Sequence, residues 1–430
     1  MTSHDQGGVV CYPVHVQAAS PGGAVEGVGA FWTPSNGVGS IRMRVAINVL
    51  GLHERSTGVW RYTYHLLAAL GRVDGINEYL ILSPYDEQKT FPDAPSSFAI
   101  ERTPVGGLSK GSEHLARVLF EQRVFPTVAR REGAKLLHVP YFAPPLRAGG
   151  IPLVVTIPDV LPLRWAQYRG APTAHAYAVL TGRAAKRAEA IIAYSEHARG
   201  EISALLDIPN ERIYVIPPAT DPRFRPADPS AQAAAREKYG LGERFLLHVG
   251  GLDVRQNLEF LIGAFAAVYN EIGDPDLSLF IAGDPQRLGS SALYPDWRPL
   301  AATFGIVDRI QCSWIAEADM PAVYSACSCF VFPSLYEGFG LTPLEAMACG
   351  APVVCSNIGA ISEAVGIAGL QVDPTDVDRV SAAIVRVLTS RELANDYHQR
   401  GLAHVRRFAW DRVAAETSAL YAEVTGTKRE

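Results

Sequence analysis

Two acidic residues, Glu337 and Glu345, stand eight positions apart on either side of a glycine-rich segment. Gly338 and Gly340 lie between them, and glycine lets the backbone take positive φ and approach a ligand closely. An apolar, β-branched run that ends at Phe332 predicts a strand before the segment, and a helix is expected soon after it. Amide groups in such a loop and at a helix N-terminus bind anions, and a diphosphate suits this geometry. The spacing therefore predicts an anion site flanked by two carboxylates.

The same two carboxylates also have a purely structural explanation. Glu337 would then be an ordinary loop charge, and Glu345 a charge near the start of a helix. An acidic side chain there contributes about 0.3–1 kcal/mol through the helix dipole without any ligand. The isolated pair leaves both explanations open.

Strand and helix patterns alternate on both sides of this segment. Strands are expected at 45–49, 79–82, 136–139, 153–157, 190–194, 245–249, 277–282, 329–333 and 352–356. Helices are expected at 60–70, 113–131, 173–187, 197–206, 257–269, 344–348, 377–388 and 410–424. Because parallel strands need such crossovers, the pattern predicts an α/β fold with doubly wound parallel sheets.

The chain of 430 residues is too long for one ordinary core, so two domains are expected. A proline-dense stretch at 216–229 interrupts the alternation, and neither a helix nor a central strand can cross it. It predicts a linker between domains at 41–220 and 221–410. Residues 1–40, rich in Gly, Ser and Pro, are expected to be a disordered extension.

Composition excludes several classes of protein. A net charge of -5 argues against a nucleic-acid partner. The six cysteines and eleven histidines show no metal-ligand spacing, so no metal or other cofactor is expected. No apolar run reaches the roughly 20 residues of a membrane span, and no secretory signal precedes the fold, which predicts a cytoplasmic protein.

The segment EGFGLTPLEAMACGAPVV, which begins at Glu337, resembles the signature of retaining nucleotide-sugar glycosyltransferases of family 4. That family has the GT-B fold, in which two Rossmann-like domains face each other across a cleft. Its E-x7-E motif is matched by Glu337 and Glu345. The resemblance implies that Glu337 contacts hydroxyls of the donor sugar and Glu345 holds the ribose hydroxyls. It also implies that the amides of Phe339, Gly340 and Leu341 line the diphosphate and sugar.

The resemblance covers the chain from about residue 43 to 422. INVLGLHERSTGVWRYTYHLLAAL places Gly58 near the donor phosphates or the acceptor, with a simple turn glycine as the alternative. FEQRVFP and LLHVPYF resemble segments of the mannosyltransferase-like branch. The first domain is thus expected to face the acceptor and the second to bind the nucleotide sugar, with a final helix at 411–430 packing back on the first.

Three residues depart from the family pattern. Pro158 stands where a His usually precedes the residue corresponding to Asp159, near the reacting carbon. Gly251 and Gln256 replace an Arg and a Lys that usually bind the diphosphate, which leaves Arg255 as the nearest cation. Removing one preorganised stabiliser typically costs about 3–4 kcal/mol of barrier. These departures motivate a second hypothesis, a catalytically degenerate GT-B protein that acts as a binding or scaffold partner.

The sequence thus predicts a retaining, metal-independent hexosyltransferase of polysaccharide biosynthesis. Its donor would be GDP-mannose or a related nucleotide sugar, and its acceptor a glycan or a lipid-linked glycan. The residues expected to act in catalysis are Glu337, Asp159 and Arg255. The residues expected to bind the donor are Gly58, Gly250, Gly251, Arg255, Gln256, Trp314, Glu337, Gly338, Phe339, Gly340, Leu341 and Glu345.

Two of these expectations have plain alternatives. Trp314 stands where the family often places the nucleotide base, and simple core packing is its alternative. The segment 113–131 carries four arginines beside apolar residues, a pattern that would suit peripheral contact with anionic lipid at the inner membrane face or with a lipid-linked acceptor. Interspersed glutamates favour an ordinary solvated amphipathic face there.

Overall fold

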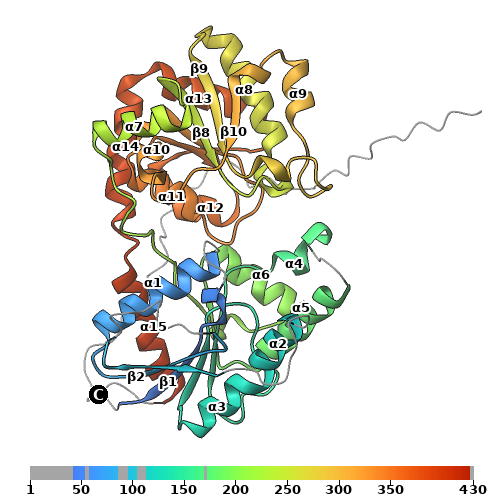
Figure 1. Cartoon of the computed structure of the whole chain (residues 1–430), viewed down its shortest axis with the longest axis vertical. Helices are drawn as coiled ribbons and strands as arrows, with labels where there is room; N and C mark the ends of the chain where they lie inside the picture. Colours follow the sequence, from blue (N-terminus) through green and yellow to red (C-terminus); the bar gives the residue numbers. More distant parts are fainter. Residues whose placement is uncertain (1–41, 54–57, 86–94, 104–112, 169–171, 427–430) are drawn as a thin grey trace, which may run out of the picture. The chain divides into compact units, whose positions relative to one another are not determined.

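The structure, a computed structural model, describes residues 42–53, 58–85, 95–103, 113–168 and 172–426. The expected extension at 1–40 lies outside these residues. Within them the chain forms two parallel sheets, each with helices on both faces (Figure 1). The α/β class predicted from the alternating pattern is confirmed.

The first sheet has the strand order β3-β2-β1-β4-β5-β6-β7, and its described pairings are parallel. Its strands are β1 (Arg44–Asn48), β2 (Glu78–Ser83), β3 (Phe98–Arg102), β4 (Leu136–Val139), β5 (Leu153–Ile157), β6 (Ala190–Ala193) and β7 (Ile213–Val215). The accompanying helices and turns are η1 (Leu50–His53), α1 (Gly58–Val73), α2 (Glu113–Leu119), η2 (Phe120–Val124), α3 (Phe125–Arg131), α4 (Leu161–Arg164), η3 (Ala166–Tyr168), α5 (Pro172–Ala185), α6 (Glu196–Leu206) and η4 (Asn210–Arg212).

The second sheet has the order β10-β9-β8-β11-β12-β13 and is also parallel. Its strands are β8 (Arg244–Val249), β9 (Leu277–Ala282), β10 (Ile310–Ser313), β11 (Cys329–Phe332), β12 (Val353–Ser356) and β13 (Leu370–Val372). The accompanying helices and turns are α7 (Pro229–Tyr239), η5 (Val254–Gln256), α8 (Leu258–Ile272), η6 (Pro285–Arg287), α9 (Arg298–Thr303), η7 (Val307–Arg309), α10 (Met320–Ala326), α11 (Leu341–Ala348), α12 (Gly359–Val365), η8 (Gly366–Ala368), α13 (Val377–Thr389) and α14 (Arg391–Val405). A last helix, α15 (Trp410–Val424), follows them in the chain and returns to the first sheet.

The helix expected over 113–131 is interrupted by the wide turn η2. Pro126 has no amide hydrogen to donate to a preceding carbonyl, and its ring crowds the turn before it. The amide of Phe125 therefore donates to the carbonyl of Phe120, five residues back. The turn brings Glu121 into a buried position, where it accepts from the hydroxyl of Tyr141 at 3.1 Å.

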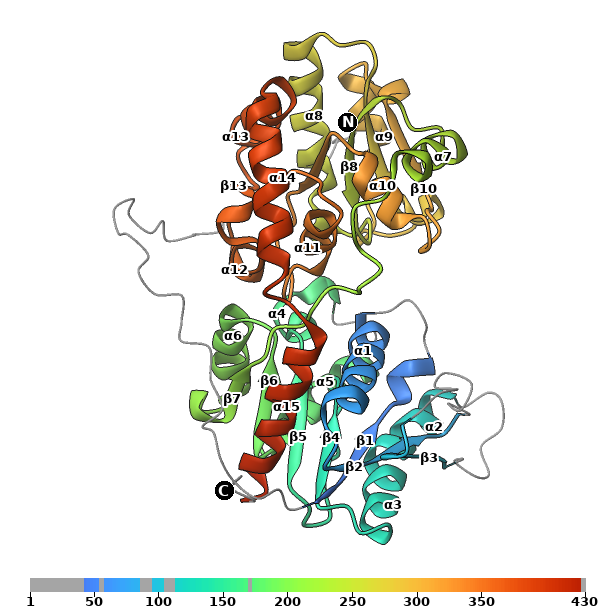
Figure 2. The ribbon, with the colours of Figure 1, turned by 90° about the vertical axis from the view of Figure 1, so that its left-hand side faces the viewer.

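The last helix, α15, packs beside α1 on one face of the first sheet (Figure 2). Its Tyr421 hydroxyl lies 2.6 Å from Nδ1 of His138 on β4, and its Ser418 hydroxyl donates to Asp74 at 2.5 Å. The ring of Tyr62 on α1 packs against Trp410 with centroids 5.8 Å apart. Buried polar contacts of this kind fix the position of the helix on the sheet, because a buried polar group without a hydrogen-bond partner would destabilise the fold.

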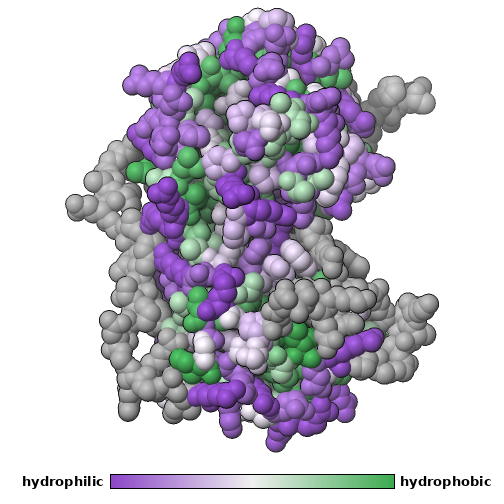
Figure 3. All heavy atoms as spheres, turned by 60° about the vertical axis from the view of Figure 1, so that its left-hand side comes forward, coloured by the Kyte–Doolittle hydropathy of each residue, from purple (hydrophilic) through white to green (hydrophobic). Residues whose placement is uncertain are grey.

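Alternation along the strands divides the side chains between the two faces of each sheet, as the period of two requires. In β1, Val45 and Ile47 join the apolar cluster that includes α1 and α15, while Ala46 joins the cluster on the opposite face. On the face shown in Figure 3, hydrophilic side chains cover much of the described surface, and apolar side chains gather in patches between them. Among the described helices, none combines the length and the apolar character that a bilayer span requires.

Candidate functional site

The second sheet reverses its winding between β8 and β11, which lie side by side, with β9 beyond one and β12 beyond the other. In such sheets the loops after the two central strands diverge and leave a ligand site at the carboxyl edge. The loop after β8 carries Arg255 and Gln256, and the loop after β11 carries Glu337. The topology therefore brings together segments about 80 residues apart in the chain.

Hydrogen bonds tie these two loops to each other. The carbonyl of Arg255 accepts from the amide of Leu335 at 2.7 Å and from the hydroxyl of Ser334 at 3.1 Å. Ser334 is fully buried, so this junction is a fixed part of the site.

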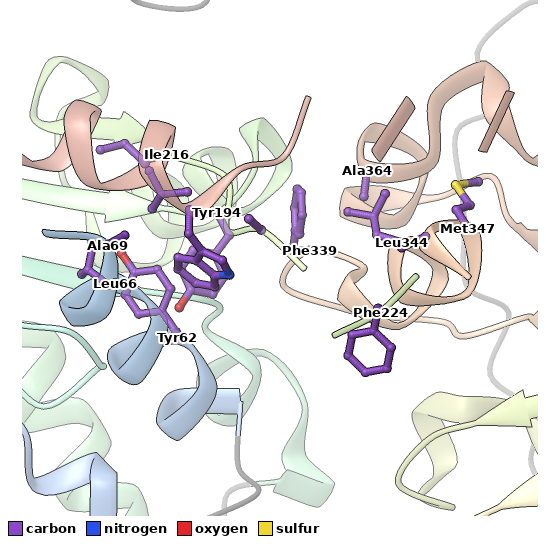
Figure 4. Close-up of a cluster of buried hydrophobic side chains, with 14 of the residues drawn as sticks. Tyr62, Leu66, Ala69, Tyr194, Ile216, Phe224, Phe339, Leu344, Met347 and Ala364 are labelled. Atoms are coloured by element: carbon purple, nitrogen blue, oxygen red, sulfur yellow. The ribbon is translucent and has the colours of Figure 1, made fainter. Parts of the chain in front are cut away.

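The glycines after Glu337 are needed for close approach and for backbone conformation. A Cβ at Gly338 would lie 2.6 Å from the carbonyl oxygen of Pro158, which no side chain tolerates. Gly340 has φ of 134°, a value that L-residues rarely adopt, and it directly precedes α11. Phe339 is buried between them in an apolar cluster that includes Leu344 of α11 (Figure 4). The loop is thus held rigidly at the start of the helix.

The amides at this helix start are available to an anion. The first turn of an α-helix has no intrahelical acceptors for its amide hydrogens. Among the described residues, no backbone acceptor pairs with the amides of Phe339, Gly340 or Leu341. These are the amides that the sequence assigned to the diphosphate and sugar.

Glu337 is half-buried and is held by neutral donors and one cation. Its Oε1 accepts from Nε2 of Gln256 at 3.0 Å and from the hydroxyl of Ser334 at 3.3 Å. Its Oε2 lies 3.8 Å from Nη1 of Arg255. Burial raises the pKa of Glu337, and the charge of Arg255 opposes that rise without cancelling it.

Arg255 is engaged by an acidic neighbour. Its Nε and Nη2 donate to the two carboxylate oxygens of Asp253 at 2.9 and 3.1 Å. The ring of Tyr168 lies 5.3 Å from its guanidinium carbon, and the Tyr168 hydroxyl accepts from Nε at 3.2 Å. Burial lowers the pKa of Arg255, but Asp253 and Glu337 raise it more, so it stays charged. A phosphate at this position would have to share the guanidinium with Asp253.

Asp159 follows β5 and lies beside this group. Its Oδ1 accepts from the amide of Leu161 at 2.9 Å. Burial raises the pKa of Asp159, while that amide and the charge of Arg255 lower it less. A Cβ added at Gly338 would come within 3.3 Å of the Asp159 side chain. The structure therefore gathers the three residues expected in catalysis.

Glu345 lies in a separate, more buried ion-pair network, with 6% of its surface exposed. Its Oε1 accepts from Nη1 of Arg61 on α1 at 3.2 Å, and its Oε2 accepts from the hydroxyl of Tyr324 on α10 at 3.3 Å. Burial raises the pKa of Glu345 to about 7, against the opposing charges of Arg61 and Arg223. A carboxyl with this pKa is half ionised near neutral pH.

The other expected binding residues are placed as follows. A Cβ at Gly250 would come within 2.4 Å of Oε1 of Gln256, and one at Gly251 within 2.7 Å of Oδ2 of Asp253, so both glycines make room for side chains of the site. Trp314 is 61% exposed, which rules out core packing. Gly58 begins α1, with open space where a Cβ would stand.

Several residues of the site belong to no motif that the sequence analysis identified. Arg61, Glu317 and Tyr324 surround Glu345, and Tyr168 and Asp253 engage Arg255. The spacing Asp253-x-Arg255 was a local signal, because short acidic side chains often bond two residues on. Arg61 could have been identified from its position in the first turn of a helix that follows a glycine-containing segment.

Two doubly wound parallel sheets, with a glycine loop at the switch point of the second, are the architecture of a GT-B glycosyltransferase. A model described as Glycosyltransferase Family 4 matches residues 56–224, and one described as Glycosyl transferases group 1 matches residues 243–390. The chain belongs to glycosyltransferase family 4, and its sequence is similar to the mannosyltransferase branch of that family.

One sequence relative is the O-antigen chain mannosyltransferase B of Escherichia coli, 34% identical over 245 residues. The alignment covers 54% of this chain and 60% of that protein. A sucrose-phosphate synthase from Thermosynechococcus elongatus has a TM-score of 0.68 at 22% identity, over 90% of this chain and 100% of that one. Anabaena Alr3699/HepE in complex with UDP-glucose has a TM-score of 0.64 at 18% identity, over 89% and 100%. The two structural likenesses confirm the predicted GT-B fold.

Proposed function

We propose that the protein transfers a hexose from a nucleotide diphosphate sugar to a glycan or lipid-linked acceptor, with retention at the anomeric carbon and without a metal. The observation that carries this proposal is the loop from Glu337 to Glu345. It combines unpaired amides at a helix start with one carboxylate at each end. Glu337 would bind hydroxyls of the sugar, Glu345 those of the ribose, and the amides between them the diphosphate.

The chemistry requires charge stabilisation at the leaving group. As the bond between the anomeric carbon and the phosphate oxygen breaks, negative charge develops on the diphosphate, and preorganised donors stabilise it. The amides of Phe339, Gly340 and Leu341 and the guanidinium of Arg255 would fill this role. The acceptor oxygen would attack from the same face, and its proton would pass to the departing phosphate oxygen. Glu337 is then free to orient the sugar.

Mannose is the proposed sugar because the relative named above is a mannosyltransferase. A nucleotide-sugar donor is supported by the structural neighbour that holds UDP-glucose. GDP-mannose is therefore the first donor to test, with UDP-glucose beside it.

A second candidate function is binding without turnover. It is favoured by the bidentate Asp253–Arg255 pair, which already neutralises the cation nearest to Glu337. Gly251 and Gln256 supply no charge in its place. A protein of this kind would bind nucleotide sugar and leave it intact.

Product analysis with purified full-length protein separates the two functions. Donors from a panel that includes GDP-mannose and UDP-glucose are incubated with a mannose-terminated oligosaccharide, and NMR reads the anomeric configuration of the product. The transferase predicts a new linkage of the donor's own anomeric configuration. An inverted product would refute retention, and binding without any product would support the second candidate.

A further inference from the structure

Charged groups from three other segments converge around Glu345. Arg61 on α1 reaches Glu345 through Nη1 and Glu317 through Nη2, the latter at 3.0 Å. Glu317 also accepts from Arg223 at 3.4 Å through its other oxygen. Arg61 therefore stands at the centre of a network that surrounds the carboxylate proposed to hold the ribose.

Arg61 can leave these partners without stranding a buried charge. Glu317 keeps Arg223, and Glu345 keeps the hydroxyl of Tyr324 and the nearby positive charge of Arg223. Ribose hydroxyls bound to Glu345 would take over the oxygen that now accepts from Arg61. Breaking an ion pair is expensive mainly when a buried charge loses every partner, and that does not occur here.

Arg61 also has unused capacity to donate. Its Nε is buried and has no hydrogen-bond partner among the described residues. Guanidinium groups bind phosphate with two parallel bonds, which makes Arg better suited than Lys to a planar contact with two oxygens. Arg61 lies in the first turn of the 16-residue helix α1, where the dipole also favours an anion.

The charge balance of the site calls for such a group. Gly251 and Gln256 carry no charge, and Arg255 shares its charge with Asp253. The diphosphate must lie between the sugar at Glu337 and the ribose at Glu345. Arg255 lies beside Glu337, at the sugar end of the diphosphate. Arg61 contacts Glu345, at the ribose end.

We propose that Arg61 is a phosphate-binding residue of the nucleotide site, which Glu345 and Glu317 hold in place until a ribose engages Glu345. This assignment rests on the proposed function, since it requires a nucleoside diphosphate as ligand. It supplies from the first domain the charge that positions 251 and 256 lack.

Calorimetry with the full chain tests the assignment by comparing ligands with and without phosphate. GDP and UDP are titrated into wild type, Arg61→Gln and Arg61→Lys, and guanosine and uridine are titrated alongside. Arg61→Gln should weaken diphosphate binding at least about tenfold, because charge-assisted bonds to phosphate are the strong ones. Binding of the bare nucleoside should change much less than diphosphate binding. Without Arg61, Glu345 has no ion pair to release, but the loss of that charge also raises the pKa of Glu345, and the two effects on ribose binding oppose each other. Arg61→Lys should recover part of the diphosphate affinity.

Arg72→Gln is the matched control, because Arg72 lies on the same helix in an exposed pair with Asp411. It should leave both affinities unchanged. An Arg61→Gln protein whose ratio of nucleoside to diphosphate affinity equals that of wild type would overturn the assignment of Arg61 alone. If Arg61→Gln binds the diphosphate more tightly than wild type, then Arg61 only blocks Glu345 in the free protein. That result would also overturn the assignment of Arg61 as a phosphate-binding residue. Wild type that binds no nucleoside diphosphate would overturn the proposed function along with it.

Discussion

Replacing Arg255 with Ala should lower kcat/KM for the donor about 100-fold. Removing one preorganised donor from a developing anion costs about 10²–10³ in rate, equivalent to about 2.7–4 kcal/mol. The guanidinium is not fully available to a phosphate, because two of its nitrogens are bonded to Asp253. Because of this sharing we expect the lower end of that range. A loss of about 100-fold corresponds to about 2.7 kcal/mol, since tenfold corresponds to about 1.4 kcal/mol.

The same change should alter the pH profile in a defined direction. The positive charge of Arg255 lowers the pKa of Glu337, which burial raises. In Arg255→Ala the pKa of Glu337 rises further, so the acid limb of kcat/KM should move to higher pH. A role for Arg255 in folding alone would lower activity without moving this limb.

The chain contains a matched control with the same local geometry. Arg298 donates through Nε and Nη2 to Asp296, also two residues before it, at 2.8 and 2.7 Å, but this pair is exposed. Steady-state kinetics of Arg298→Ala should equal wild type, since exposed pairs contribute about 0–1 kcal/mol. Equal kinetics for Arg255→Ala and Arg298→Ala would refute the assignment of Arg255 to the diphosphate.

Three further predictions concern the ribose anchor and metal. Glu345→Ala should weaken nucleoside diphosphate binding by about 1.5–3 kcal/mol, the range for hydrogen bonds to a charged group, and calorimetry on the folded variant measures it. An unchanged dissociation constant would remove Glu345 from the site. Nucleoside binding should tighten as pH rises through about 7, because the carboxyl of Glu345, which faces Arg61 and Tyr324, ionises there and accepts stronger bonds. Glu345→Gln should bind with no such pH dependence, and a wild-type profile that is equally flat would contradict the raised pKa. Finally, turnover should survive EDTA, since amides and arginines would replace a cation, whereas strict dependence on Mn²⁺ or Mg²⁺ would rule out the metal-independent mechanism.

The central strands could be predicted from the sequence because they are buried on both faces and form continuous apolar runs. The bounds expected for 136–139, 153–157 and 277–282 match β4, β5 and β9. The four strands that the sequence analysis did not predict are β3, β7, β10 and β13, which are the edge strands of the two sheets. Their side chains are partly exposed, so their sequences lack the continuous apolar run of a strand that is buried on both faces.

The candidate site divides in a similar way. The glycine loop and its two glutamates are contiguous in sequence, so their spacing could be interpreted directly. The partners of those glutamates come from distant segments, such as Arg61 on α1 for Glu345 and Gln256 after β8 for Glu337. Such residues come together only through the order of the strands in each sheet, and that order cannot be predicted from local sequence patterns. The exposure of Trp314 likewise depends on packing around the end of β10, which its neighbours in sequence do not determine.

The central claim is tested most directly by acceptor-dependent release of nucleoside diphosphate from GDP-mannose, measured for wild type and for Glu337→Gln. The account predicts that a mannose-terminated acceptor accelerates release by wild type. It also predicts that Glu337→Gln loses at least about tenfold of this rate, because a neutral side chain accepts weaker bonds from the sugar hydroxyls. Donor that binds tightly to wild type but is not consumed at any acceptor concentration, across GDP and UDP sugars alike, would contradict the transferase account.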